Sequence, residues 1–365
     1  MKRIAFYCSS ISWGGLEMNF VRYAQWLSEC GHSVHVYCVD ASPIHQQIIK
    51  ANLSHTTVAH NRKYADFINA WKVSRLVKSF GAEIIWFRDT RDMSILGLVK
   101  MLLGGKPKLI YQQAMQLGVD KKDILHTIRF NRIDIWIATL NFLKEQVLTR
   151  THFSEKKLHV IPLGVDASRL HTNLPNKSTC RKQLLLPADK LLIGVIGRID
   201  PLKGQHIAIN AIQLCPDHVH LVIMGESTKN EGNEYEHELK KKVRSLGLEK
   251  RVHFRPYSSN VGPFYQSLDI FAMTSKGETF GTVTIEAMSF SLPVIGTNSS
   301  GTPEILNFGQ AGLLFEPENA LELSEHIKAL AVSDTERVQW GERAHQRFQQ
   351  LYAKEASLQA IARIL

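Results

Sequence analysis

The sequence predicts an α/β protein of two doubly wound, Rossmann-like domains that face each other across a cleft. Three observations support this prediction. The chain has 365 residues, which is more than one ordinary hydrophobic core accommodates. Short apolar runs alternate with amphipathic helical patterns, and the alternation starts again near residue 190 after a polar stretch. Strands that alternate with helices form parallel sheets, and such sheets bind ligands beyond the carboxyl ends of their strands.

The first half of the chain alternates between the two patterns from its start. Residues 2–8 form a short apolar run, and residues 16–31 repeat apolar side chains such as Phe20 and Leu27 at helical spacing before Gly31, a residue typical of helix ends. The same alternation of strand and helix patterns continues along this half of the chain. Strands are expected at residues 32–40, 82–89, 108–113, 133–140 and 157–164, and helices at residues 66–80, 92–103 and 140–150.

A polar, weakly periodic stretch at residues 166–190 separates the two halves of the chain. We therefore expect an N-terminal domain at residues 1–170 and a second domain at residues 171–345. Residues 346–365 continue as a terminal helical region. The sequence contains no internal repeat that would indicate a solenoid instead.

Charge is distributed unevenly along the chain. The net charge of +10 lies entirely in the first 172 residues, which hold 23 Lys and Arg against 13 Asp and Glu, while the remainder balances at 21 against 21. A basic surface attracts phosphate-bearing polymers or anionic membranes, and it also serves simply to keep a protein in solution. The pattern at residues 66–80 interleaves apolar and basic side chains, which fits core packing as well as peripheral attachment to an anionic leaflet. We expect no nucleic-acid partner.

The sequence argues against a membrane span and against a disulfide or zinc framework. No apolar run reaches the roughly 20 residues that a spanning helix needs, and the opening residues are expected to form a strand rather than a signal peptide. The five cysteines are odd in number and form no C-x-x-C pair. We expect a reducing, cytoplasmic setting and no zinc site.

Residues with phosphate-binding chemistry follow the predicted strands. Gly14 and Gly15 lie between a strand and a helix, where backbone N–H groups can approach an anion closely, although a simple tight turn explains them as well. Neither a G-x-G-x-x-G nor a P-loop spacing is present. Arg198 and Lys203 follow the strand expected at residues 190–198, where the two cations are placed to hold a diphosphate or are ordinary surface charges.

Two glutamates flank a further predicted phosphate cradle. The run at residues 268–290 predicts a strand, a loop and a helix in turn, with Glu278 in the loop and Glu286 about one turn into the helix. Backbone N–H groups at residues 280–282 suit a phosphate. Carboxylates repel a phosphate but accept hydrogen bonds from hydroxyl groups. The pattern therefore indicates a ligand with sugars on both sides of a diphosphate, which is a nucleotide sugar.

These residues lie in stretches that resemble a known family. SKGETFGTVTIEAMSFSLPVIGTNSSGTPEIL, at residues 275–306, resembles the E-x7-E signature of retaining glycosyltransferases of the family 4 kind, which have the two-domain GT-B fold. Residues 12–37, 160–170 and 196–204 match further motifs of that family, in the right order and over most of the chain.

The resemblance implies a role for each matching residue. Arg198 and Lys203 would bind the donor phosphates and stabilise the leaving diphosphate, and Glu278 would bind hydroxyls of the transferred sugar as the third member of the catalytic group. Glu286 would hold the ribose. The implied donor-binding residues are Gly15, Arg198, Lys203, Glu278, Thr279, Phe280, Gly281, Thr282 and Glu286, with Arg255 and Pro256 near the nucleobase.

The resemblance also implies partners and a setting. The donor would be a nucleotide-diphosphate sugar, with no separate cofactor and no metal. The acceptor would be a glycan or a lipid-linked sugar in bacterial polysaccharide or glycoconjugate synthesis, reached from the cytoplasm at the inner face of the membrane. The terminal helix would cross back to the N-terminal domain.

One position departs from the family pattern. Many relatives have a histidine near the reacting sugar, and the matching position here is Ala114 or a neighbour. Gln112, Gln113 or His126 would then take that role, or the chain binds a nucleotide sugar without transferring it. Asp89 and Asp92 could contact the acceptor or merely pair with Arg88 and Arg91. Another enzyme of the same fold, an epimerase or a phosphorylase, remains a third possibility.

Overall fold

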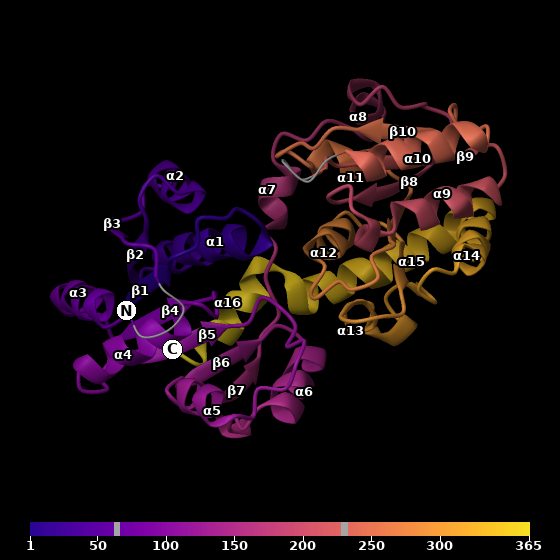
Figure 1. The fold of residues 1–365 in the computed structure, drawn as a ribbon. Coiled ribbons are helices and arrows are strands. Elements are labelled where there is room, and N and C mark those ends of the chain that lie inside the picture. The colour runs from indigo at the N-terminus through magenta and orange to yellow at the C-terminus, as the bar shows by residue number, and fades with distance from the viewer. Residues whose placement is uncertain (62–65, 228–232) are drawn as a thin grey trace. The chain divides into compact units, whose positions relative to one another are not determined.

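A computed structural model describes residues 1–61, 66–227 and 233–365 (Figure 1). Contacts divide the chain into two compact units, residues 1–161 with 361–365, and residues 162–360. The first unit is called the N-terminal unit below and the second the C-terminal unit. Each contains one parallel sheet with helices, so the prediction of two Rossmann-like α/β domains is confirmed. The division falls between Ile161 and Pro162, whereas the polar composition of the sequence suggested a boundary after residue 170.

The N-terminal unit is built on a seven-stranded sheet in the order β3-β2-β1-β4-β5-β6-β7. All of its strand pairs are parallel. The strands are β1 (Arg3–Cys8), β2 (Ser33–Val39), β3 (His55–Val58), β4 (Ile84–Phe87), β5 (Lys108–Gln112), β6 (Ile135–Ala138) and β7 (Leu158–Val160). The order reverses between β1 and β4, which are neighbours, as in a Rossmann sheet.

Helices cover both faces of this sheet (Figure 1). α1 and α2 contact each other on one face, and α3, α4 and α5 follow one another on the other face. The helices are α1 (Gly15–Glu29), α2 (Pro43–Lys50), α3 (Phe67–Phe80), α4 (Met93–Leu102), α5 (Ile124–Asn131) and α6 (Asn141–Arg150). α2, α3 and α5 begin after side-chain caps from Ser42, Asp66 and Asp123, and α3 ends at Gly81, whose φ of 68° suits glycine.

The C-terminal unit repeats the same plan with six parallel strands in the order β10-β9-β8-β11-β12-β13. The strands are β8 (Leu191–Ile196), β9 (Val219–Met224), β10 (Val252–Arg255), β11 (Ile270–Met273), β12 (Val294–Thr297) and β13 (Leu313–Phe315). Every residue of β9 is buried, which explains why this strand has apolar residues without alternation. The order again reverses between two neighbouring strands, β8 and β11.

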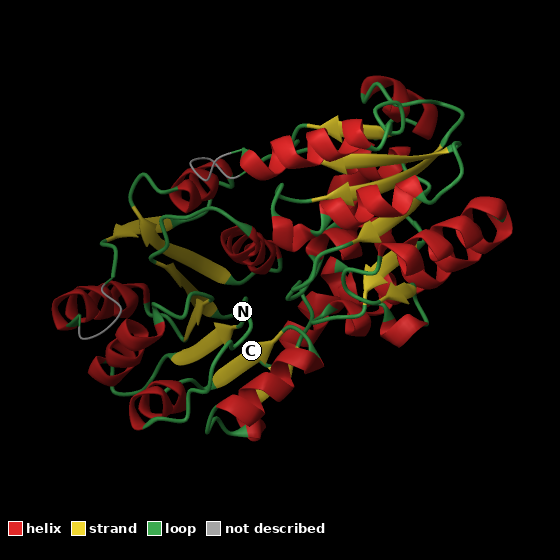
Figure 2. Ribbon diagram, turned by 45° about the vertical axis from the view of Figure 1, so that its right-hand side comes forward, coloured by secondary structure: helices red, strands yellow, loops and turns green. Residues whose placement is uncertain are grey.

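The helices of this unit pack in two layers, and Figure 2 shows strands lying between them. α9 contacts α10 and α14, whereas α11 contacts α8 and α12 contacts α15. The helices are α7 (Ala167–His171), α8 (Lys177–Gln183), α9 (Gln205–Gln213), α10 (Glu234–Ser245), α11 (Gly262–Ser267), α12 (Thr282–Ser289), α13 (Thr302–Ile305), α14 (Ala320–Val332), α15 (Asp334–Arg347) and α16 (Lys354–Ala362). Two of them, α7 and α8, lie in the stretch that the sequence presented as a polar connection.

The terminal region is helical with an interruption. α15 ends at Arg347, a wide turn follows at Phe348–Tyr352, and α16 begins at Lys354. Between the two helices the backbone pairs with Val165, whose N–H donates to the carbonyl of Tyr352 and whose carbonyl accepts from Lys354. By contacts, residues 361–365 belong with the N-terminal unit.

Candidate functional site

The candidate site of the C-terminal unit lies at the carboxyl ends of β8 and β11. Arg198 follows β8, and Glu278 lies in the loop after β11. Because these two parallel strands are neighbours at the point where the strand order reverses, their loops emerge side by side at one edge of the sheet. The structure therefore places at one edge of the sheet two residues that are about 80 positions apart in the sequence.

A tight turn presents Lys203. Pro201–Lys203 form a short 3-10 turn, which Asp200 caps by accepting from the Leu202 N–H at 2.8 Å. The loop after β11 holds this turn from the other side: the Thr274 hydroxyl donates to the Lys203 carbonyl at 2.8 Å, and the Lys276 N–H donates to Leu202. The lysine backbone is thus fixed against the loop that carries Glu278.

Lys203 and Glu278 form an ion pair. Lys203 Nζ lies 2.7 Å from Glu278 Oε2, and the two side chains are 29% and 19% exposed. The other carboxylate oxygen accepts from the Gly281 N–H at 3.3 Å. Arg198 is more exposed, at 57%, and its guanidinium lies 3.4 Å from Asp200. The edge of the sheet therefore carries two cations, one held by the glutamate predicted to bind sugar.

The loop then enters α12 through a left-handed glycine. Gly281 has a φ of 68°, and a Cβ there would lie 3.1 Å from the Glu278 side chain. The N–H groups in the first turn of a helix have no acceptor within the helix, so the start of α12 at Thr282 is rich in donors. Glu286 lies one turn further along, is 8% exposed, and accepts a hydrogen bond from Tyr265 at 2.9 Å.

Tyr265 is a residue of this site that was not predicted from the sequence. It belongs to α11, ahead of β11, and its side chain is fully buried. An aromatic residue in a short apolar segment is typical of a core position, so no pattern in the sequence distinguishes it.

In the predicted nucleobase region, the Arg255 side chain is occupied by hydrogen bonds to the backbone. The Arg255 guanidinium donates to the carbonyls of Leu185 and Phe254 at 2.7 Å each, and also to the carbonyl of Leu184. This side chain holds the segment after α8 against β10. Only the main chain at Arg255 and Pro256 therefore stays a candidate for contact with a base.

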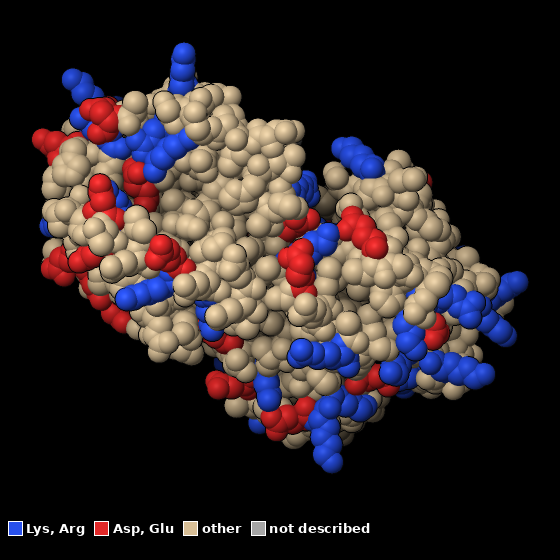
Figure 3. Space-filling model, turned by 180° about the vertical axis from the view of Figure 1, so that it is seen from behind, with Lys and Arg blue, Asp and Glu red and all other residues tan. Residues whose placement is uncertain are grey.

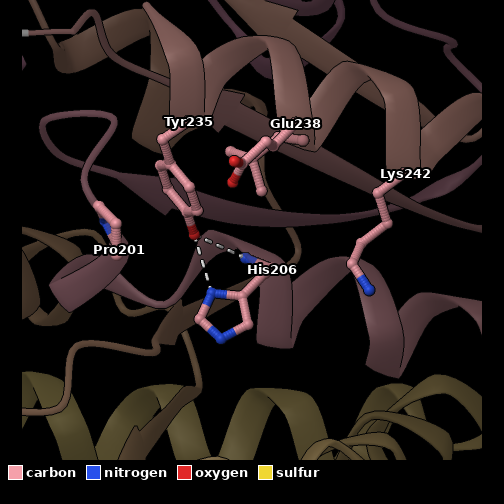
Figure 4. Close-up of a pocket in the computed structure, with 6 residues that line it drawn as sticks. Pro201, His206, Tyr235, Glu238 and Lys242 are labelled. Atoms are coloured by element: carbon pink, nitrogen blue, oxygen red, sulfur yellow. Dashed lines mark hydrogen bonds between the residues drawn. The ribbon is translucent and has the colours of Figure 1, made fainter.

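A pocket of about 330 Å³ is lined on one side by Pro201, the first residue of the Lys203 turn (Figure 4). Its lining residues come from the turn, α9 and α10: Pro201, His206, Tyr235, Glu238, Leu239 and Lys242. The His206 ring lies between two partners, 2.8 Å from the Tyr235 hydroxyl and 3.1 Å from Glu318. These contacts fix the start of α9, directly after the turn. None of the residues that line the pocket is a predicted site residue.

In the N-terminal unit, Gly15 begins α1 after a loop held by two carboxylates. Asp92 accepts from the Ser9 N–H at 3.1 Å and from the Ser9 hydroxyl at 2.5 Å. Glu17 accepts from the Ser10 hydroxyl at 2.7 Å. The glycine pair therefore lies at the end of a loop whose shape is set by buried side chains.

The predicted acceptor residues of this unit are mostly engaged. Asp89 pairs with Arg91, whose Nη2 lies 2.7 Å from its carboxylate, so the pairing alternative describes this residue. The amide oxygens of Gln112 and Gln113 accept from the indole N–H groups of Trp86 and Trp136.

The remaining two acceptor candidates lie on either side of a loop. His126 lies on α5, and its Nδ1 is 2.5 Å from Oδ2 of Asp123, the residue that caps this helix. Ala114 follows β5 and is partly exposed. Because both amide oxygens are engaged, Gln112 and Gln113 do not offer a free acceptor in place of the family histidine.

Asp92 is the buried acid of this network, and its environment gives a pH-dependent prediction. Burial, assisted by the charge of Asp89, raises its pKa to about 7, against the hydrogen bonds from Ser9. An unfolded aspartate has a pKa of about 3.9. Between these values the folded state holds a proton that the unfolded state has released, so stability falls as the pH rises from about 4 to about 7, by about 4 kcal/mol at most.

The Asp92→Asn variant lacks this titration. We expect the free energy of unfolding of the wild type, relative to the variant, to decrease between pH 4 and pH 7 and then to level off. Urea unfolding at several pH values measures both proteins under matched conditions. Parallel stability profiles would contradict the assignment of a raised pKa to Asp92.

Two family models match the chain. One, described as Glycosyltransferase Family 4, matches residues 13–169, and the other, described as Glycosyl transferases group 1, matches residues 176–347. The fold and these matches define the class: the chain belongs to the family 4-type glycosyltransferases of GT-B fold.

Solved structures share the whole fold. The chain is similar to the Anabaena protein Alr3699/HepE in complex with UDP, with a TM-score of 0.88, 21% identity, and coverage of 100% of this chain and 99% of that one. It is also similar to a glycosyltransferase from Rickettsia africae ESF-5, with a TM-score of 0.87, 20% identity, and coverage of 100% and 97%.

Curated relatives match over shorter ranges. The chain is 32% identical over 197 residues to the D-inositol 3-phosphate glycosyltransferase of Corynebacterium jeikeium, which is 51% of this chain and 46% of the relative. It is 28% identical over 185 residues to the lipopolysaccharide core biosynthesis glycosyltransferase LpsE of Rhizobium meliloti, which is 51% and 52%. The chain thus spans about half the length of the curated relatives it matches.

Proposed function

We propose that this protein is a retaining glycosyltransferase that moves a sugar from a nucleotide-diphosphate sugar to an acceptor hydroxyl. The observation that carries the proposal is the Lys203–Glu278 ion pair of 2.7 Å at the edge of the sheet, with Arg198 in the loop after β8 and Glu286 on the helix that follows Glu278. A diphosphate needs cations, and the sugars on either side of it need carboxylate acceptors. The UDP-glucose in a structure of the Anabaena neighbour is a ligand of this kind, and the UDP in another is the nucleotide part of such a ligand.

Donor binding would rearrange the ion pair. The diphosphate would take Lys203 as its partner, which would release Glu278 to accept hydrogen bonds from hydroxyls of the transferred sugar. Arg198 would contact the same phosphates through its exposed guanidinium. N–H groups of residues 279–282 would donate to the sugar or the diphosphate, and Glu286 would bind the ribose.

Catalysis would come from charges that are already in place. As the bond from the sugar to the diphosphate breaks, negative charge grows on the leaving phosphate, and fixed cations stabilise that charge more in the transition state than in the ground state. The acceptor hydroxyl would attack from the same face that the diphosphate leaves and would give its proton to the departing phosphate oxygen. This route needs neither a protein nucleophile nor a metal.

The acceptor is proposed to be a glycan or a lipid-linked sugar in bacterial cell-surface synthesis, bound by the basic N-terminal unit. One curated relative acts in lipopolysaccharide core biosynthesis. Figure 3 shows Lys and Arg side chains gathered toward the lower right of that view, over the N-terminal unit. We propose a cytoplasmic protein that reaches its acceptor at the inner face of the membrane.

α3 supports peripheral attachment to such a membrane. Phe67, Ile68 and Trp71 are 66%, 71% and 53% exposed, so core packing does not account for them. The Arg75 guanidinium lies 5.0 Å from the centre of the Trp71 ring, which places a cation beside this apolar surface. Among the described residues, no helix combines the length and the apolar character needed to span a bilayer.

Co-sedimentation with vesicles tests the attachment. We expect binding to vesicles that contain anionic lipid, weaker binding to neutral vesicles and at high salt, and several-fold weaker binding of a Phe67→Ser/Ile68→Ser double variant. Binding that is equal for both proteins at every salt concentration would remove this part of the proposal.

The central experiment is a thermal-shift panel of nucleotide diphosphates and nucleotide sugars, because a ligand of the folded state raises the melting temperature by mass action. We expect one nucleotide family to stabilise the protein selectively. Transfer or hydrolysis of the selected donor is then measured for the wild type and for Glu278→Gln. A protein that no nucleotide stabilises, or a Glu278→Gln variant that transfers normally, would contradict the proposal.

A second candidate function is nucleotide-sugar binding without transfer. Ala114 at the position of the family histidine favours it, as do the engaged oxygens of Gln112 and Gln113. The same panel distinguishes the two functions. A binding protein would be stabilised by the donor and would show no turnover with any acceptor or with water.

A further inference from the structure

Tyr265 contacts α12 at two points on one face. Its hydroxyl lies 2.9 Å from Glu286 Oε2 and 3.1 Å from the carbonyl oxygen of Val283. A phenol has a single proton, so it donates to one of these acceptors at a time. The carboxylate is the stronger acceptor because it is charged, and it is also the nearer of the two. The Tyr265 hydroxyl therefore donates its hydrogen bond chiefly to Glu286.

The hydroxyl is held in a fixed position by its ring. The Tyr265 side chain is fully buried, and its ring contacts Phe264, Phe271 and Phe290 at centroid distances of 5.4, 5.8 and 5.4 Å. Burial, together with the adjacent Glu286 charge, raises the pKa of Tyr265 well above its usual value, so the phenol stays a donor at all physiological pH values. A rotamer locked by packing fixes the carboxylate that it contacts.

We propose that Tyr265 is a positioning residue that orients the Glu286 carboxylate for the ribose hydroxyls of the donor and thereby sets the preference for ribose over 2′-deoxyribose. This inference rests on the proposed function, because it gives Glu286 the ribose contact. With one carboxylate oxygen held by Tyr265, the orientation of the other is set as well. A site built to accept a hydrogen bond from a hydroxyl discriminates against a ligand that lacks it.

A merely structural role predicts a different result. In that case the hydrogen bond joins α11 to α12, and its loss lowers stability without changing which sugar the site prefers. The ratio of affinities for a ribonucleotide and its 2′-deoxy form separates the two roles, because a general loss of stability affects both ligands equally.

The experiment compares the wild type with Tyr265→Phe, which removes only the hydroxyl. Calorimetry of the full chain measures the dissociation constants of UDP and 2′-deoxy-UDP, and of the ADP, GDP and CDP pairs if UDP does not bind. For the wild type we expect about tenfold tighter binding of the ribonucleotide, and for Tyr265→Phe about two- to threefold. Tyr37→Phe is the matched control, because Tyr37 is also buried and donates to a carbonyl, that of Leu76, in the N-terminal unit.

The possible outcomes separate a failure of this inference from a failure of the proposed function. A wild-type ratio retained in Tyr265→Phe overturns the inference, as does a wild type that binds both forms of a nucleotide equally well. A wild type that binds none of the nucleotide pairs contradicts the proposed function instead. If Tyr265→Phe fails to fold, the wild type and Glu286→Gln decide: a ribose preference that persists in Glu286→Gln overturns the inference.

Discussion

Replacing Lys203 by alanine is expected to lower the kcat/KM of sugar transfer by about 10²- to 10³-fold, the usual effect of removing one group that stabilises developing negative charge. Lys203 is fixed on a capped turn, and its ammonium already lies at the edge where the leaving diphosphate is proposed to bind. Its charge therefore requires little reorganisation during the reaction, and most of its effect should appear in kcat.

A lysine–glutamate pair elsewhere in the same unit provides the control. Lys240 Nζ lies 2.6 Å from Glu236 on α10, a distance close to the 2.7 Å of the Lys203 pair. Lys240→Ala should keep the wild-type rate of transfer, since an exposed pair of this kind contributes little even to stability. Steady-state kinetics with the donor selected by thermal shift measures both variants. Equal rates for Lys203→Ala and the wild type would place the diphosphate elsewhere.

Gly204→Ala adds one methyl group directly after the Lys203 turn, and we expect it to lower the free energy of unfolding strongly. Gly204 has a φ of 67°, and a Cβ there would lie 2.2 Å from the carbonyl oxygen of Thr274. Left-handed backbone alone costs an alanine about 1 kcal/mol. The clash with a main-chain atom must move the turn or the loop after β11, so we expect a total loss of at least about 3 kcal/mol.

Gly247→Ala is a control that measures the cost of left-handed backbone alone, without a clash. Gly247 has a φ of 66°, and a Cβ there would have no atom within 4 Å. Urea unfolding should give a loss of about 1 kcal/mol for this control. Gly204→Ala should also reduce transfer, because Thr274 holds the Lys203 carbonyl through its hydroxyl. Equal losses of stability in the two variants would show that the turn adapts without strain.

Much of the fold could be predicted because it depends on periodic local patterns. The alternation of apolar runs and helical stretches predicted both parallel sheets, and most of the expected elements are present with shifted ends. In the N-terminal unit, the elements that the sequence did not indicate are short. β3 has four residues, none of them fully buried, and α2 and α5 have eight each. Such segments contain too few buried positions for a clear period.

The sequence predicted which residues of the candidate site follow the ends of strands, but it could not predict which side chains contact one another. Residues that follow neighbouring parallel strands must emerge at the same edge, which is why Arg198, Lys203 and Glu278 were predicted together. The same argument could not show that Arg255 holds three carbonyl groups, or that tryptophan indoles occupy the oxygens of Gln112 and Gln113. Those contacts depend on distances of a few ångströms between distant segments.

By itself, the sequence determined the two parallel sheets and the edge at which cations, acids and helix N–H groups gather, because strand and helix periods and the parallel order leave few alternatives. Only the tertiary structure decided that Lys203 is paired with Glu278 and that Tyr265 holds Glu286. The physical reason is that burial and packing select the partner of each polar group, and both depend on the whole fold rather than on any local segment.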